Sequence, residues 1–210
     1  MVLNHRGFDE WAKDYDQSVR LSEGKEAYPF AGYQDVINLV YHMAGHKPSS
    51  TILDVGFGTG TLTKRLYDDG HNIYGIDFSK EMIAIAKGKM PNANLFQKNM
   101  EEGLPFEFEK EKFHTIISTY ALHHVTDRKK IEWIQQLSFS LHEGGSIIIG
   151  DIAFETRSAH DQCKNRSYED WDHSEFYTVY EEIKEELIAL KFKVDYKQIS
   201  HCGGVLLVRR

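Results

Sequence analysis

The stretch that decides the fold reads Asp54-Val55-Gly56-Phe57-Gly58-Thr59-Gly60. It ends an apolar run at residues 51–55, typical of a strand, and leads into a helical pattern at residues 60–69. Glycine has no Cβ, so a glycine-rich loop lets the backbone approach a ligand closely, and the N-terminus of the following helix offers N–H donors. The stretch therefore predicts a strand–loop–helix unit whose loop binds a ligand.

An acidic residue strengthens this interpretation. The next strand, residues 72–76, leads into Asp77, where a carboxylate can accept hydrogen bonds from ribose hydroxyls. A dinucleotide loop places its third glycine one position later, where this chain has Thr61. The form found here, with Asp54 before three alternating glycines, instead resembles the loop of class I methyltransferases. Glycines that only shape a tight turn are the remaining alternative, and Asp77 argues against it.

Outward from the loop, short apolar runs alternate with helical patterns. The expected strands are residues 51–55, 72–76, 94–97, 113–118, 146–151, 192–200 and 205–209, and the expected helices are residues 8–19, 30–44, 60–69, 79–87, 127–141 and 176–190. Alternating strands and helices predict a doubly wound, Rossmann-like α/β fold with a mostly parallel sheet and right-handed crossovers. Gly203-Gly204 lies between the last two strands and predicts a closing antiparallel hairpin.

Length and composition set the class of protein. A chain of 210 residues, with 41% hydrophobic and 27% charged residues, is typical of one soluble domain. We expect N-terminal helices and a lid at residues 1–46, a cofactor-binding core at residues 50–152, and a substrate-side insert with the closing hairpin at residues 153–210. The net charge of −7 disfavours a nucleic-acid partner.

The cellular compartment can be predicted from sequence features that are absent. It contains no apolar run long enough to cross a membrane and no signal-peptide core at its N-terminus. Cys163 and Cys202 form no CxxC pair, which fits reduced thiols. A cytoplasmic protein is the expectation.

Further motifs extend the likeness to a known family. They are Leu104-Pro105-Phe106, the run Ile116-Ile117-Ser118-Thr119-Tyr120-Ala121-Leu122-His123-His124, Leu141-His142-Glu143-Gly144-Gly145 and residues 8–16. With them, the chain resembles a class I S-adenosylmethionine-dependent methyltransferase over essentially its whole length, and in particular a group of small bacillus-type methyltransferases. The resemblance implies a seven-stranded sheet with one antiparallel strand, and S-adenosylmethionine as cofactor.

The same resemblance implies where the cofactor lies, over the carboxyl ends of the first strands. The residues that it places there are Tyr15, Asp54, Gly56, Gly58, Gly60, Asp77, Phe78 and Thr119. By this likeness the glycines pass beneath the methionine part, Asp54 orders the loop and Asp77 holds the ribose. Phe78 packs on adenine, and Tyr15 closes over the carboxylate end.

One position departs from the family pattern. Many members carry an aspartate that accepts from the adenine amino group, and this chain has Met100 there. Adenine recognition is then expected from backbone groups of Met100 and Glu101, together with the side-chain amide of Asn99.

The catalytic candidates follow the fourth strand. Methyl transfer from a sulfonium is an in-line displacement, so a protein accelerates it mainly by aligning the reacting atoms. Tyr120, His123 and His124 stand where the family's pocket for a small-molecule acceptor opens. Neighbouring histidines point apart in regular structure, so at most one of them is expected to face the substrate; packing of the loop is the alternative role. A non-catalytic binder of the cofactor and an NAD-dependent oxidoreductase stay open as other functions.

Two further groups of residues allow a purely structural role as well as a functional one. His42 and His46 have metal-ligand spacing, but they lie at a helix end, where imidazoles interact favourably with the helix dipole. No metal site is predicted. Trp171, Phe176 and Tyr177 either wall the acceptor pocket or belong to the core.

Overall fold

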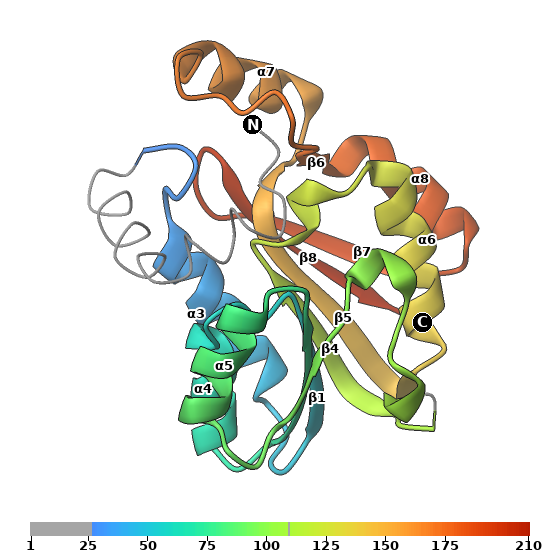
Figure 1. Ribbon diagram of the computed structural model, residues 1–210. Helices are drawn as coiled ribbons and strands as arrows, with labels where there is room; N and C mark the ends of the chain where they lie inside the picture. The colour runs from blue at the N-terminus through green and yellow to red at the C-terminus, as the bar shows by residue number, and fades with distance from the viewer. Residues whose placement is uncertain (1–26, 109) are drawn as a thin grey trace.

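The computed structural model describes residues 27–108 and 110–210 (Figure 1). The predicted helix at residues 8–19, and with it Tyr15 and most of the predicted lid, lies outside these residues. Among the helices of the described chain, none is long and apolar enough to cross a membrane.

The centre of the fold is a mostly parallel sheet. Its strands are β1 (Thr51–Val55), β2 (Asn72–Asp77), β3 (Asn94–Gln97), β4 (Phe113–Thr119), β5 (Leu141–Phe154), β6 (Thr178–Val179), β7 (Lys193–Gln198) and β8 (Gly203–Arg209). The order is β3-β2-β1-β4-β5-β8-β7, with β8 antiparallel to both β5 and β7. The two-residue β6 pairs with β5 and adds an eighth strand to the seven expected. The predicted α/β fold is confirmed.

Helices cover both faces of this sheet. Figure 1 shows α3 (Tyr33–Ala44), α4 (Thr61–Asp68) and α5 (Lys80–Lys89) on one face, and α6 (Asp127–Ser138) and α8 (Tyr180–Ala189) on the other. The central strands pack against both helix layers, because successive side chains of a strand point to opposite faces of the sheet. Ile117 packs with the first layer and Ile116 with the second. Continuous apolar strands are therefore what this sheet requires.

Local signals placed some helix ends well. The helix expected over residues 79–87 is α5, and the hydroxyl of Ser79 caps it by accepting a hydrogen bond from the Met82 N–H at 3.2 Å. The helix expected to reach residue 141 is shorter, because α6 ends at Ser138 and β5 already begins at Leu141. The polar insert contains α7 (Arg157–Arg166), whose only buried residue is Cys163, so it offered no apolar stripe to recognise.

The hairpin closes differently from the expectation. Gly203 and Gly204 do not form the turn; they begin β8, and residues 199–202 connect the strands. Gly204 is required by packing, since a Cβ there would lie 2.0 Å from the hydroxyl oxygen of Tyr196. Close approach of a side chain, rather than turn geometry, explains this glycine.

Candidate functional site

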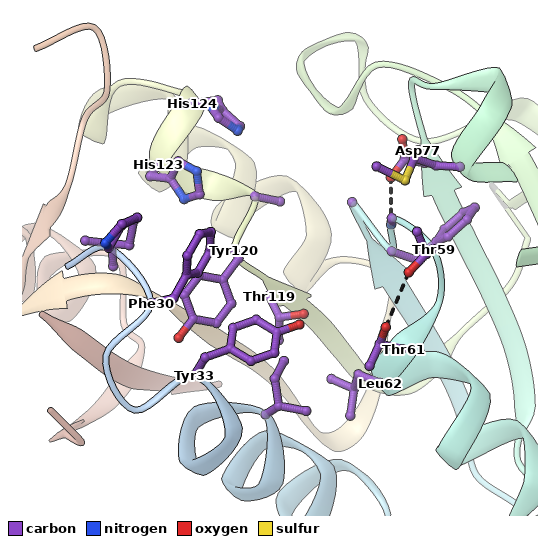
Figure 2. A pocket seen from close by; sticks show the side chains of 18 of the residues that line it. Phe30, Tyr33, Thr59, Thr61, Leu62, Asp77, Thr119, Tyr120, His123 and His124 are labelled. Atoms are coloured by element: carbon purple, nitrogen blue, oxygen red, sulfur yellow. Dashed lines mark hydrogen bonds between the residues drawn. The ribbon is translucent and has the colours of Figure 1, made fainter. Parts of the chain in front are cut away.

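A cavity of about 340 Å³ opens at the carboxyl ends of β1, β2 and β4. Its walls come from the loop after β1, the end of β2, the turn after β4, the segment before α3, and residues 170–175. Figure 2 shows Asp77, Thr59 and Leu62 on one side, with Tyr33, Tyr120 and His123 on the opposite side. The carboxyl edge of a parallel sheet is the usual ligand site of doubly wound folds.

The three glycines of the loop have different surroundings. All have positive φ, at 75° for Gly56, 56° for Gly58 and 79° for Gly60. A Cβ on Gly56 would lie 2.5 Å from the Cβ of Ala121, and one on Gly60 would lie 2.8 Å from the Cε of Met90. Within residues 27–108 and 110–210, no atom lies within 4 Å of a Cβ placed on Gly58, and this residue lines the cavity. Gly60 is absent from the cavity wall and serves helix packing.

Asp77 joins the end of β2 to this loop. Its Oδ2 accepts a hydrogen bond from the Gly58 N–H at 2.8 Å, and its Oδ1 accepts one from the Ser79 N–H at 2.9 Å. The residue is 6% exposed and lines the cavity. A carboxylate at the end of this strand is the group that accepts hydrogen bonds from ribose hydroxyls in related doubly wound folds.

Lys89 contacts the glycine loop, although it was not among the candidate site residues. It lies at the end of α5, and its Nζ donates to the carbonyl oxygen of Thr59 at 2.9 Å. Asp77 and Lys89 thus hold the same loop from two sides.

Asp54 lies behind the loop rather than in the cavity wall. Its Oδ2 accepts from the Thr63 hydroxyl at 2.6 Å, which ties the end of β1 to α4. Burial raises the pKa of Asp54 to about 7, against the lowering effect of the Thr63 hydrogen bond. The contact fits the loop-ordering role expected of this residue.

The remaining cofactor candidates divide into two groups. Phe78, Met100 and Thr119 line the cavity. Asn99 and Glu101 are absent from its wall: the Oδ1 of Asn99 accepts from the Glu101 N–H at 3.0 Å and caps the short 3-10 helix Met100–Glu102. The Asn99 amide is therefore engaged in local structure in this conformation.

Tyr120 belongs to an aromatic wall. Its backbone has φ 49°, a left-handed conformation that turns the chain away from β4. Its ring centroid lies 4.8 Å from that of Tyr33 and 5.8 Å from that of Phe30, and all three line the cavity (Figure 2).

His123 is held by a buried carboxylate. Its Nδ1 lies 2.6 Å from the Oδ1 of Asp151, a residue of β5 that is 2% exposed. The Oδ2 of Asp151 also accepts the backbone N–H groups of Leu122 and His123, at 2.9 and 3.1 Å. Burial alone would lower the pKa of His123, but the charges of Asp151 and Glu175 outweigh it and raise that pKa. In turn, His123 outweighs the effect of burial and lowers the pKa of Asp151.

Glu175 faces both histidines. Its Oε1 lies 3.7 Å from the Nε2 of His123 and 3.8 Å from the Nδ1 of His124, and its Oε2 accepts from the Tyr177 hydroxyl at 2.7 Å. Both histidines line the cavity, and the expectation that at most one of them faces the substrate stays a prediction. They lie in the 3-10 helix Leu122–His124 rather than in a strand, with ring planes 59° apart.

Asp151 and Glu175 were not among the sequence candidates. Asp151 follows the apolar run of residues 146–150, and the same signal that identified Asp77 could have found it. Glu175 lies in the segment between α7 and β6, where no sequence pattern marks it as a site residue. Of the three aromatic residues considered there, Trp171 and Tyr177 are buried in the core and Phe176 is 45% exposed, and none lines the cavity.

The other histidine pair has a structural explanation. The Nδ1 of His46 lies 2.8 Å from the carbonyl oxygen of Met43, near the end of α3. This contact supports the interpretation that His46 caps a helix C-terminus.

Comparison with known sequences relates the chain to methyltransferases. A family model described as a methyltransferase domain matches residues 52–145. An "uncharacterized methyltransferase" of Bacillus cereus is 33% identical over 207 residues, covering 95% of this chain and 94% of the relative. Another, from Anoxybacillus flavithermus, is 38% identical over 156 residues, covering 73% of this chain and 69% of the relative.

Solved structures share the fold. The structure titled "DhpI-SAM-HEP complex" aligns with a TM-score of 0.72 at 18% identity, over 97% of this chain and 94% of that chain. The magnesium protoporphyrin IX methyltransferase (ChlM) of Synechocystis, with bound SAH, aligns with a TM-score of 0.66 at 19% identity, over 86% and 84%. The fold and the glycine loop define a Rossmann-like methyltransferase domain. The chain belongs to the class I S-adenosylmethionine-dependent methyltransferases, with relatives in the Bacillus group.

Proposed function

We propose that this enzyme transfers the methyl group of S-adenosylmethionine to a small-molecule acceptor by in-line displacement. The observation that carries the proposal is the arrangement of one cavity, with Gly58 and Asp77 on one side and His123, His124 and Glu175 on another. The acceptor's nucleophilic atom attacks the methyl carbon, the carbon–sulfur bond breaks, and its electron pair goes to sulfur to give S-adenosylhomocysteine. Alignment of these atoms supplies most of the acceleration.

The donor occupies the loop side. Asp77 accepts the ribose hydroxyls, and Phe78 packs on adenine. Gly58 leaves the space into which the methionine part fits, because none of the described residues has an atom near its missing Cβ. Backbone groups at Met100 complete the adenine end.

The acceptor occupies the histidine side. Its aromatic wall consists of Phe30, Tyr33 and Tyr120. Its polar end consists of Glu175 and of His123, which Asp151 holds. The cavity volume of about 340 Å³ lies at the lower end of the range for ligand pockets, roughly 300–1,000 Å³. Because the same cavity also holds the donor, the space left for the acceptor suits a small molecule rather than a folded macromolecule.

A screen with methyl-labelled S-adenosylmethionine tests the proposal. Metabolite extracts incubated with the enzyme should yield a labelled small molecule, and His123→Gln should reduce its formation while S-adenosylhomocysteine still binds. A protein that binds the cofactor tightly but labels nothing is a binder rather than an enzyme. Label found only in protein or nucleic acid refutes the small-molecule acceptor.

A further inference from the structure

We propose that His123, His124 and Glu175 form a binding site for a divalent metal ion, zinc in type, at the acceptor end of the cavity. Each of the three offers one ligand atom, and these atoms all lie within 4.8 Å of one another. All three residues line the cavity, and Figure 2 shows the two imidazoles beside the aromatic wall. Two imidazoles with one carboxylate are the protein ligands of a common class of catalytic zinc site, which keeps its fourth position open.

The distances fit one ion. Zinc binds histidine nitrogen and carboxylate oxygen at about 2.0–2.2 Å, so neighbouring ligand atoms of a tetrahedral ion lie about 3.4 Å apart. The Oε1 of Glu175 lies 3.7 Å from the Nε2 of His123 and 3.8 Å from the Nδ1 of His124. A shift of a few tenths of an ångström brings the carboxylate oxygen to this spacing from each imidazole nitrogen, and the two nitrogens themselves lie within 4.8 Å of each other.

Neighbouring groups already orient two of the three ligands. The carboxylate of Asp151 holds the Nδ1 of His123, which leaves the Nε2 of that ring facing Glu175. The hydroxyl of Tyr177 holds the Oε2 of Glu175, which leaves its Oε1 facing the histidines. A histidine that bridges a carboxylate and a metal ion is a recurrent arrangement, in which the carboxylate fixes the ring and raises its basicity.

The local charge also suits a cation. Asp151, Glu175 and Asp172 place three carboxylates around the site against the single ammonium of Lys130, and one divalent ion balances the remaining two negative charges. The Glu175 side chain is 19% exposed and that of His124 is 35% exposed, so an ion has a path from solvent. This charge balance and access complete the requirements of a metal site.

The bound ion would act on the acceptor, and this role rests on the proposed function. Because all three ligand residues line the cavity, an acceptor hydroxyl or thiol would reach the ion there through its oxygen or sulfur. The ion would lower the pKa of that group, whose proton would leave to bulk water. The electron pair then attacks the methyl carbon while the carbon–sulfur bond breaks toward sulfur. A hydroxyl or thiol compound is thus the acceptor class that this site favours.

Metal binding can be measured without knowing the acceptor. The tag-free, full-length chain is stripped with a chelator and dialysed against Zn²⁺, and Co²⁺ is used as a spectroscopic substitute. One ion per chain is expected, and Co²⁺ should give the visible absorption of a low-symmetry site. Glu175→Gln and His124→Asn should each weaken Zn²⁺ binding more than about 100-fold, beyond the 10–100-fold effect of losing an outer partner. S-adenosylhomocysteine affinity should be unchanged, which shows that these variants are folded.

A matched control comes from a second histidine pair. The rings of His114 and His142 lie 4.4 Å apart outside the cavity, so His142→Asn should leave Zn²⁺ binding intact. Asp151→Asn should weaken Zn²⁺ binding 10–100-fold. The proposal is overturned if the chain binds no stoichiometric ion, if Glu175→Gln and His124→Asn retain it, or if only His142→Asn loses it. Labelling of a metabolite by metal-free enzyme would overturn the metal role and leave the proposed function standing.

Discussion

The glycine loop supports a test that separates ligand contact from packing. Gly58→Val should leave the protein folded and abolish binding of S-adenosylhomocysteine. The new Cβ would meet no atom of the described residues within 4 Å, so the expected loss of stability is the strain of φ 56°, about 1–2 kcal/mol for a residue with a side chain. The β-branched side chain would instead extend into the cavity that Gly58 lines.

Gly60→Val is the matched comparison. Its φ of 79° adds similar strain, and its Cβ would lie 2.8 Å from Met90 and 3.4 Å from Ala86. Overpacking adds about 1–3 kcal/mol to that loss. Thermal unfolding should therefore show the larger decrease for Gly60→Val, and calorimetry should show the complete loss of binding for Gly58→Val. If Gly58→Val binds S-adenosylhomocysteine within a few-fold of wild type, the loop does not approach the ligand and the donor assignment is wrong.

Three further variants probe the hydrogen bonds of the site. Asp77→Ala should weaken S-adenosylhomocysteine binding by about 1.5–3 kcal/mol, the effect of deleting a charged partner, and unchanged affinity by calorimetry would remove this residue from the donor site. Lys89→Met removes the hydrogen bond to Thr59 and should weaken the same binding by about 1 kcal/mol, with wild-type affinity as the contrary result. Asp151→Asn should destabilise the fold by about 3–5 kcal/mol, as breaking a buried ion pair does. The loss should be greatest between about pH 4 and 6.5. Below this range Asp151, whose pKa is lowered, becomes protonated and the contribution of the ion pair to stability disappears. Above pH 6.5 that contribution is lost as the pH rises through the raised pKa of His123. Urea unfolding across pH measures this, and a pH-independent difference would contradict the ion pair.

The geometry of the glycine loop could be predicted from the sequence, because it depends on local chemistry. Positive φ favours glycine at residues 56, 58 and 60, and a strand end places Asp77 beside them. Ser79 capped its helix for the same local reason. Each of these signals lies within a few residues of the structure that it specifies.

The acceptor half depends on contacts between distant segments. Glu175 meets His123 only after residues 170–175 fold back over the carboxyl edge of the sheet, and no periodicity encodes that return. Gly204 was assigned to a turn because its actual reason, the ring of Tyr196, comes from a neighbouring strand. Side chains whose role is set by tertiary approach are therefore the ones that pattern alone misplaces.

Asp77 and Lys89 hold the glycine loop through contacts within the protein itself. Ordering a backbone residue opposes binding by about 1–2 kcal/mol, so a loop that the protein already orders retains affinity that a flexible loop would lose. None of these loop contacts involves residues 170–175. On the proposed function, substitutions in that short segment would therefore change the acceptor while the loop that binds the donor is kept.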